Sequence, residues 1–185
     1  MVLTPSVMIP LGSTAPDFEL IEAVTGQKFS LQQLKSQVAT VVMFICNHCP
    51  YVKHIQAKLS EIADLYEIRG VSFIAINSND AASYPEDSFE KMKESAGKNF
   101  YTFPYLFDES QEVAKAYQAA CTPDFYIFDK NLKLVYRGQF DDSRPGNEVK
   151  VTGKDLTTAL DSLIAGQQVS TDQKPSIGCN IKWKK

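Results

Sequence analysis

The sequence lacks the features that would place it in several other classes of protein. It has no apolar run long enough to cross a bilayer, and its net charge of -3 offers no basic surface to a nucleic acid. Its first ten residues contain no lysine or arginine and are interrupted by Pro5 and Pro10, unlike a secretory signal. We therefore expect a cytoplasmic protein whose partners include neither a membrane nor a nucleic acid.

Internal repeats, low-complexity tracts and linkers are also absent. The 185 residues suit one domain of ordinary size, and 44% hydrophobic with 22% charged residues are typical of a globular chain. We predict a single domain over residues 1–185, with an irregular C-terminal tail from about residue 167. The four cysteines are too few for a disulfide scaffold, so a Cys-x-x-Cys pair favours catalysis or metal binding.

The most informative stretch of the chain runs from residue 40 to residue 54. It begins with a continuous apolar run, which predicts a strand buried on both faces at about 38–45. Cys46 and Cys49 follow, and helical spacing of apolar residues predicts a helix over about 47–68. Free N–H groups at a helix start stabilise an anion, so we expect Cys46, nearer the solvent, to ionise more easily than an ordinary cysteine.

The remaining pattern predicts a layered α/β architecture. A hairpin is expected around the turn at Thr25 and Gly26, with Ser30 capping a short helix. Further elements are expected at 71–76, from Pro85 to about 96, and at 103–107, 112–119, 125–128, 132–136 and 154–164. Alternating strands and helices require parallel pairing, while the late hairpin adds antiparallel edge strands. We predict an α/β fold in three layers, with a central mixed sheet and helices on both faces.

These features together resemble the thioredoxin superfamily. The resemblance rests on the strand, the Cys-x-x-Cys pair and the helix, with Thr122-Pro123 just before a later strand. Residues 12–18 (Gly-Ser-Thr-Ala-Pro-Asp-Phe) and 30–34 (Ser-Leu-Gln-Gln-Leu) resemble the redoxin branch, the alkyl hydroperoxide reductase and thiol-specific antioxidant group. The Cys-Asn-His-Cys motif and residues 136–145 are similar to bacterial members of that branch. A thioredoxin-like fold with an N-terminal hairpin and an inserted helix is implied.

The sequence departs from the pattern of this superfamily at two places. Thioredoxin carries a buried acid six residues before its first cysteine, where this chain has Thr40. The peroxidase members need a Pro-x-x-x-Thr-x-x-Cys motif, and Met43 and Ala39 stand where its threonine and proline would precede Cys46. With Thr40 at the first position, the role of the acid is either unfilled or supplied by another residue, and the second departure disfavours strong peroxidase activity.

The resemblance assigns roles to the motif. Cys46 would attack a disulfide as a thiolate, and Cys49 would resolve the mixed disulfide. His48 lies between them and would stabilise the Cys46 thiolate, which predicts a dithiol more oxidising than thioredoxin. The residues themselves also allow half of a zinc site or two incidental buried thiols, and an exposed loop position for His48.

Other residues are expected around this pair. Thr122 and Pro123 match the position where the superfamily keeps a cis-proline opposite the dithiol, and its backbone can pair with a substrate peptide. The candidates for supporting positions are Asn47, Lys53, Cys121 and Arg137. Cys121 is either an inert packed thiol or a participant in the chemistry. Cys179 is either a late resolving partner or a tail cysteine docked against the body.

The sequence thus predicts a thiol-disulfide oxidoreductase that cycles Cys46 and Cys49 without a bound cofactor or resident metal. Its expected electron partner is another dithiol protein or glutathione, and its substrate a protein disulfide or a peroxide. The alternatives are a thiol-dependent, antioxidant peroxidase and a copper(I) carrier that uses Cys46, Cys49 and a histidine, since thiolates suit that ion.

Overall fold

The computed structural model describes residues 3–185. The strands are β1 (Leu3–Pro5), β2 (Glu19–Glu22), β3 (Lys28–Ser30), β4 (Ala39–Phe44), β5 (Val71–Asn77), β6 (Tyr105–Phe107), β7 (Cys121–Thr122), β8 (Asp124–Asp129), β9 (Leu134–Gly138) and β10 (Ile177–Asn180). The helices are α1 (Leu31–Leu34), α2 (Pro50–Glu67), α3 (Phe89–Lys98), α4 (Glu112–Ala116) and α5 (Lys154–Ile164), with a 3-10 turn η1 (Pro85–Asp87). None of these helices has both the length and the apolar character needed to cross a membrane.

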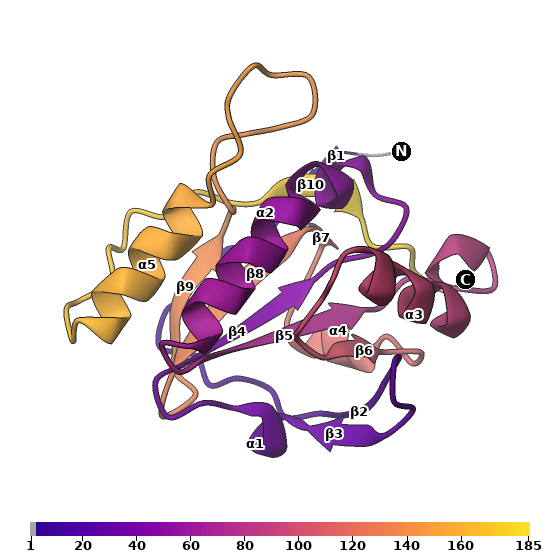
Figure 1. Ribbon diagram of the computed structural model, residues 1–185, viewed down its shortest axis with the longest axis horizontal. Coiled ribbons are helices and arrows are strands. Elements are labelled where there is room, and N and C mark those ends of the chain that lie inside the picture. Colours follow the sequence, from indigo (N-terminus) through magenta and orange to yellow (C-terminus); the bar gives the residue numbers. More distant parts are fainter. Residues whose placement is uncertain (1–2) are drawn as a thin grey trace.

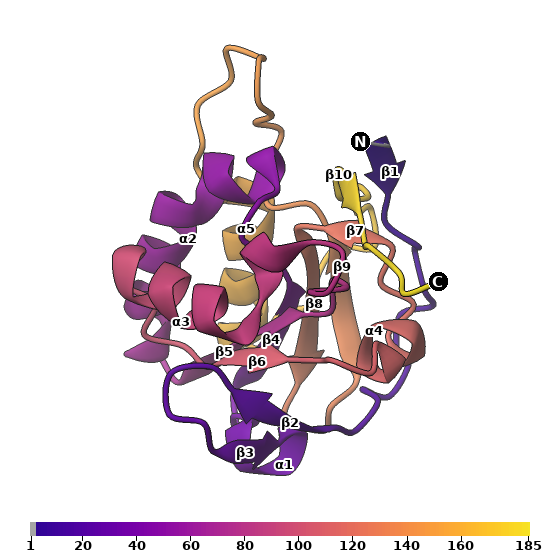
Figure 2. The same ribbon diagram turned by 90° about the vertical axis from the view of Figure 1, so that its right-hand side faces the viewer.

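The main sheet has seven strands in the order β3-β2-β6-β5-β4-β8-β9. β4 pairs in parallel with β5, and β5 with β6, whereas β8 runs antiparallel to both β4 and β9. Helices α2, α3 and α5 pack on one face and α1 and α4 on the other, each face with its own buried core. Figures 1 and 2 show the helices on either side of the sheet. The predicted three-layer α/β fold with a mixed central sheet is confirmed.

Strand β4 lies at the centre of this arrangement because its side chains are apolar on both faces. Val41 and Met43 belong to the core under α2, and Val42 and Phe44 belong to the opposite core. Every residue of the strand is buried. Alternate side chains of a strand point to opposite faces, so an uninterrupted apolar run can only be covered from both sides. The strand therefore fixes the position of whatever follows Phe44.

The N-terminal hairpin and its cap follow the sequence prediction. Leu20 of β2 pairs with Phe29 of β3. Ser30 caps α1, and a reciprocal hydrogen bond from the Ser30 N–H to the Gln33 side chain completes a capping box. The hairpin is joined to the main sheet through β2, which pairs with β6.

The sequence predicted an irregular tail from about residue 167, but part of this C-terminal segment forms a strand. Ile177–Asn180 forms β10, which lies between β1 and β7 in a separate three-stranded sheet. Figure 2 shows this small sheet beside the end of the main sheet. The strand is short and its partners come from distant parts of the chain, so periodicity within the tail could not reveal it. Its position brings Cys179 next to Thr122.

Two helix starts differ from the expected ones. Helix α2 begins at Pro50 rather than at residue 47, because Pro50 occupies the first helical position and Cys49 is the N-cap. Pro85 opens the 3-10 turn η1, and the following helix α3 has its own N-cap, Ser88. Because α2 begins at Pro50, Cys49 rather than Cys46 lies at the start of the helix.

Candidate active site

The two motif cysteines lie between the end of a buried strand and the start of a helix. β4 ends at Phe44, Cys46 follows two residues later in the connection to α2, and Cys49 is the N-cap of α2. The first N–H groups of a helix have no partner within the helix, so they are available to a sulfur at the N-cap. The N–H of Val52, in the first turn, interacts with the Cys49 sulfur and lowers its pKa. The helix start thus acts on Cys49 and not, as predicted, on Cys46.

The Thr122–Pro123 segment lies directly against both sulfurs. Its peptide bond is cis, as the family resemblance implied. The Thr122 Oγ1 lies 3.3 Å from the Cys46 Sγ, and the Thr122 carbonyl oxygen lies 3.2 Å from the Cys49 Sγ. The structure therefore brings Thr122 against Cys46 and Cys49, which precede it by more than seventy residues in the chain.

The pKa values of the two motif thiols are shifted in opposite directions. The hydrogen bond from Cys46 lowers the pKa of Cys49 to about 5, against the opposing effect of burial, with help from Cys179 and the Val52 N–H. The hydrogen bond to Cys49, burial and the nearby charge of Asp87 raise the pKa of Cys46 well above its ordinary value. These directions are opposite to the expectation that Cys46 is the more acidic thiol, and they follow the position of Cys49 at the start of the helix.

Neither sulfur is open to solvent. Cys46 is 2% exposed and Cys49 is fully buried. Cys46 was expected nearer the solvent, but it is as well covered as its partner. A large substrate therefore reaches the pair only if the segments around it move.

His48 does not lie in an exposed loop, because a buried carboxylate holds its ring. The His48 Nδ1 lies 2.6 Å from the Asp87 Oδ2, and the ring stacks on Tyr84. The hydrogen bond to Asp87 raises the pKa of His48. The imidazole is therefore more readily charged than a free histidine, next to the dithiol.

Asp87 is the functional candidate that the sequence did not reveal. Its carboxylate is fully buried and accepts hydrogen bonds from the Asn47 N–H and the Asn79 side chain, each at 2.7 Å. Burial raises its pKa, but the hydrogen bonds from His48, Asn79 and Asn47 outweigh that effect, so the pKa is lowered. The polar residues that follow β5 could have indicated that this segment lies near the cysteines. The carboxyl ends of the parallel strands β4 and β5 meet at one edge of the sheet, and the cysteines follow β4.

The supporting residues predicted from the sequence have separate positions. Asn47 donates through its side chain to the Glu86 carbonyl and accepts from the Tyr105 hydroxyl, which ties the motif to η1 and β6. Lys53 lies exposed on α2. Arg137 binds the Ile9 carbonyl and the Gln173 side chain, so it joins β9 to the N-terminal segment and the tail. Of these three residues, Asn47 adjoins the dithiol.

Cys121 and Cys179 occupy different environments. Cys121 is fully buried, and burial together with the charge of Asp124 raises its pKa far above the ordinary value, so it is a packed thiol. The Cys179 Sγ lies 2.7 Å from the Cys49 Sγ. Burial and this contact raise the pKa of Cys179 to about 12. The structure thus adds Cys179 to the site.

One group of side chains near the dithiol has the composition of a metal site. Ligand atoms of Cys46, His48 and Asp87 lie within 4.8 Å of one another. Thiolate, imidazole and carboxylate are ligands that zinc accepts, but copper(I) prefers sulfur to a carboxylate. The Nδ1 of His48 is already engaged by Asp87 at 2.6 Å, which leaves Nε2 as its available ring nitrogen.

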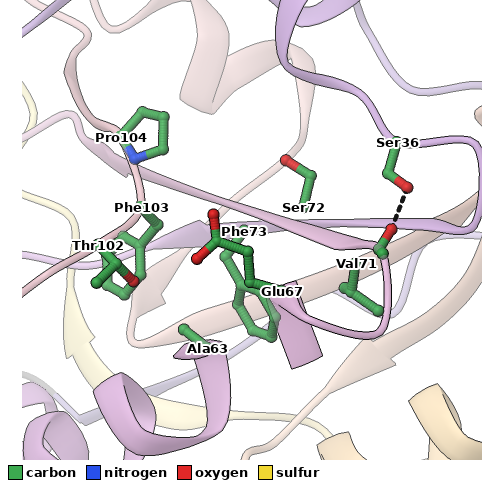
Figure 3. A pocket seen from close by; sticks show the side chains of 10 residues that line it. Ser36, Ala63, Glu67, Val71, Ser72, Phe73, Thr102, Phe103 and Pro104 are labelled. Carbon is green, nitrogen blue, oxygen red and sulfur yellow. Dashed lines mark hydrogen bonds between the residues drawn. The ribbon is translucent and has the colours of Figure 1, made fainter. Parts of the chain in front are cut away.

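Hollows on the surface lie both beside the dithiol and far from it. A small hollow lined by Tyr51, Pro123 and Arg144 adjoins the site. A larger cavity of about 280 Å³, in Figure 3, is lined by Glu67, Phe73 and Phe103 among others, and Ser36 at its rim donates to the Gly70 carbonyl. That cavity lies at the amino end of β5, opposite the end of the sheet that carries the cysteines, so we assign it no part in their chemistry.

The sheet, the dithiol after β4 and the cis-proline segment opposite it define a protein of the thioredoxin-like class. The family model described as Redoxin matches residues 10–156. The chain therefore belongs to the redoxin family.

Two solved structures are similar to this chain over almost its whole length. One is an uncharacterized conserved protein from Geobacillus kaustophilus, 60% identical, with a TM-score of 0.98 and coverage of 100% of this chain and 97% of that one. The other is a hypothetical protein from Sinorhizobium meliloti 1021, 50% identical, with a TM-score of 0.96 and coverage of 98% of each chain. Among curated proteins, the thiol-disulfide oxidoreductase ResA of Geobacillus kaustophilus (strain HTA426) is 28% identical over 137 residues, 73% of this chain and 74% of ResA.

Proposed function

We propose that this protein is a thiol-disulfide oxidoreductase that cycles Cys46 and Cys49 between dithiol and disulfide. The observation that carries the proposal is the position of both motif sulfurs against the cis Thr122–Pro123 segment, with the Cys46 Sγ 3.3 Å from the Thr122 Oγ1 and the Cys49 Sγ 3.2 Å from the Thr122 carbonyl oxygen. Two cysteines three residues apart, one of them present as a thiolate, can attack a disulfide and then close a ring. The name of the curated relative, a thiol-disulfide oxidoreductase, supports the same class of reaction.

The reaction transfers two electrons from the pair to a substrate disulfide. The thiolate attacks one substrate sulfur, the substrate S–S bond breaks, and the departing sulfur takes up a proton. The second thiol then gives up its proton and attacks the enzyme sulfur of the mixed disulfide. The Cys46–Cys49 bond forms, and the second substrate thiol leaves.

Either sulfur of the pair can begin this sequence, because one proton is shared between them. The lowered pKa of Cys49 favours the thiolate at that sulfur. Movement of the shared proton from Cys46 to Cys49 would place the charge on Cys46, where the Thr122 hydroxyl stabilises it. We propose that the sulfur uncovered by the approaching substrate makes the first bond.

Reduction of insulin disulfides with dithiothreitol as electron source tests the proposal. We expect Cys46→Ser and Cys49→Ser each to lower the rate at least about tenfold, since a single thiol cannot resolve a mixed disulfide. Cys121→Ala is the matched control, because this packed thiol lies outside the pair. Equal rates for the wild type and Cys46→Ser would refute the dithiol cycle.

The electron partner and the substrate are finer parts of the proposal. We propose a protein dithiol or glutathione as electron partner and a protein disulfide as substrate. Hydroperoxide consumption measured with the same electron source tests the peroxidase alternative, and anaerobic titration with copper(I) tests the carrier alternative. The cytoplasmic location stays a prediction, which cell fractionation would test.

A further inference from the structure

The strand β10 places a third thiol in contact with the proposed redox pair. The Cys179 Sγ lies 2.7 Å from the Cys49 Sγ, and these residues are 130 positions apart in the chain. Cys179 is 1% exposed and Cys49 is fully buried. Cys179 is therefore shielded from bulk solvent while its sulfur touches the Cys49 sulfur.

The backbone of the tail is built for this close approach. Cys179 pairs with Thr122 in the antiparallel ladder between β10 and β7. The preceding residue is Gly178, where a Cβ atom would lie 2.0 Å from the Thr122 carbonyl oxygen. Real atoms do not approach so closely, so the strand can reach Thr122 only with glycine at this position. The contact between Cys49 and Cys179 thus depends on a defined strand register.

We propose that Cys179 is a third redox-active thiol, which exchanges with the Cys46–Cys49 disulfide to form a Cys49–Cys179 disulfide. This proposal rests on the dithiol cycle described above. The Cys179 sulfur attacks Cys49, the Cys46–Cys49 bond breaks, and the proton of Cys179 ends on Cys46. The exchange consumes no external oxidant or reductant, because one disulfide and one thiol are present before and after it.

The geometry favours exchange at Cys49 over the other motif cysteine. A disulfide bond is about 2.05 Å long, so closing the Cys49–Cys179 bond needs a displacement of the two sulfurs of less than about 1 Å. The product would store the disulfide between two buried residues and release Cys46 as a thiol beside Thr122. Cys46 could then react with a further substrate while Cys49 is protected.

The decisive experiment uses Cys46→Ser, in which the ordinary disulfide cannot form. The folded variant is oxidised with a small aromatic disulfide, denatured, alkylated and mapped by mass spectrometry without reduction. We expect a Cys49–Cys179 crosslink with the loss of two hydrogens, and only Cys121 among the three remaining cysteines open to alkylation. The control Cys46→Ser with Cys121→Ala should form the same crosslink, and Cys46→Ser with Cys179→Ser should instead keep a mixed disulfide.

A stable mixed disulfide on Cys49 of Cys46→Ser, with Cys179 fully alkylated, would overturn the proposal. Cys179 would then be only a hydrogen-bond partner of Cys49. If Cys46→Ser does not fold, the oxidised wild type is mapped in the same way. Alkylated Cys46 together with a Cys49–Cys179 crosslink supports the exchange, whereas alkylated Cys179 in every oxidised molecule refutes it.

The same crosslink maps distinguish a failure of the Cys179 proposal from a failure of the Cys46–Cys49 dithiol cycle. A Cys46–Cys49 crosslink in the oxidised wild type, without any crosslink to Cys179, leaves the dithiol cycle intact and removes only the third thiol. If oxidised wild type contains no crosslink between Cys46 and Cys49 and none to Cys179, both proposals fail.

Discussion

The His48 Nδ1 lies 2.6 Å from the Asp87 Oδ2, although the two residues are 39 positions apart. His48 belongs to the cysteine motif, and Asp87 ends the 3-10 turn η1 inserted after β5. The carboxylate raises the pKa of His48 through a hydrogen bond, and its negative charge raises the pKa of Cys46. The segment inserted after β5 therefore affects the pKa values of both His48 and Cys46.

Replacement of Asp87 by asparagine should change two titrations in the same direction. In Asp87→Asn we expect the pKa of His48 to fall, because its hydrogen bond to a carboxylate is lost, and the pKa of Cys46 to fall, because a nearby negative charge is removed. Ring proton shifts in NMR follow His48. Ultraviolet thiolate absorbance follows Cys46 in a background of Cys49→Ser, Cys121→Ala and Cys179→Ser, compared with and without Asp87→Asn. Glu86→Gln, which removes an exposed neighbouring charge, is the control. An unchanged His48 titration in Asp87→Asn would contradict the assignment.

The acidity of Cys49 should depend on a hydrogen-bond donor at position 46. The hydrogen bond from Cys46 is the largest cause of the low pKa of Cys49. We therefore expect Cys46→Ser, which retains a donor, to keep Cys49 acidic, and Cys46→Ala to raise its pKa. The thiolate absorbance of both reduced variants, each carrying Cys121→Ala, measures this difference. Identical titration curves for serine and alanine would show that the hydrogen bond does not set the charge.

The hydroxyl of Thr122 should act on Cys46 alone. Its Oγ1 lies 3.3 Å from the Cys46 Sγ and lowers the pKa of that thiol. We expect Thr122→Val to raise the pKa of Cys46 further and to slow insulin reduction, since less thiolate is available there. Thr122→Ser is the matched control, because it keeps the hydroxyl. A serine variant as impaired as the valine variant would indicate a packing effect instead.

Substitution of Gly178 by alanine tests the docking of β10, and substitution of Gly97 by alanine is its matched control. At Gly178 a Cβ would lie 2.0 Å from the Thr122 carbonyl oxygen, whereas a Cβ at Gly97, within α3, meets nothing within 4 Å. We expect Gly178→Ala to lower the free energy of unfolding by about 1–3 kcal/mol through overpacking. Gly97→Ala should raise it by roughly 0.5–1 kcal/mol through helix propensity. Urea unfolding of both variants measures this contrast, and a stable Gly178→Ala would show that β10 can shift without cost.

The buried carboxyl of Asp124 should make stability fall as the pH rises. Burial raises the pKa of Asp124 to about 8, whereas an unfolded aspartate titrates near about 3.9. The folded protein retains a proton that the unfolded chain releases, so the contribution of this group to the free energy of unfolding decreases between these two values.

Asp124→Asn cannot titrate and should therefore gain stability relative to the wild type as the pH increases from about 5 to about 8. Each unit of pKa difference corresponds to about 1.4 kcal/mol, so the relative gain is expected to reach a few kcal/mol. Urea unfolding at several pH values measures it, with the exposed Asp172→Asn as control. Parallel pH profiles for the wild type and Asp124→Asn would refute the raised pKa.

Local patterns in the sequence were sufficient for the architecture. The apolar run of β4 predicted a strand buried on both faces, and Val42 and Met43 do belong to opposite cores. Ser30 and the turn at Gly26 predicted the hairpin and the cap of α1. These elements follow from periodicity and from turn and cap chemistry, which act over a few residues.

The sequence by itself determined that Cys46 and Cys49 follow a buried strand, and the family resemblance pointed to Thr122 and Pro123 as their neighbours. Only the tertiary structure decided that Cys49 lies at the start of the helix, where its pKa is lowered, since the helix begins one residue after it. It also decided that Asp87 and Cys179 adjoin the pair. Both come from segments distant in the chain, and their contacts depend on the pairing of β10 with β7 and on the packing of η1. No local pattern encodes such contacts, because they arise only when separate elements are packed together.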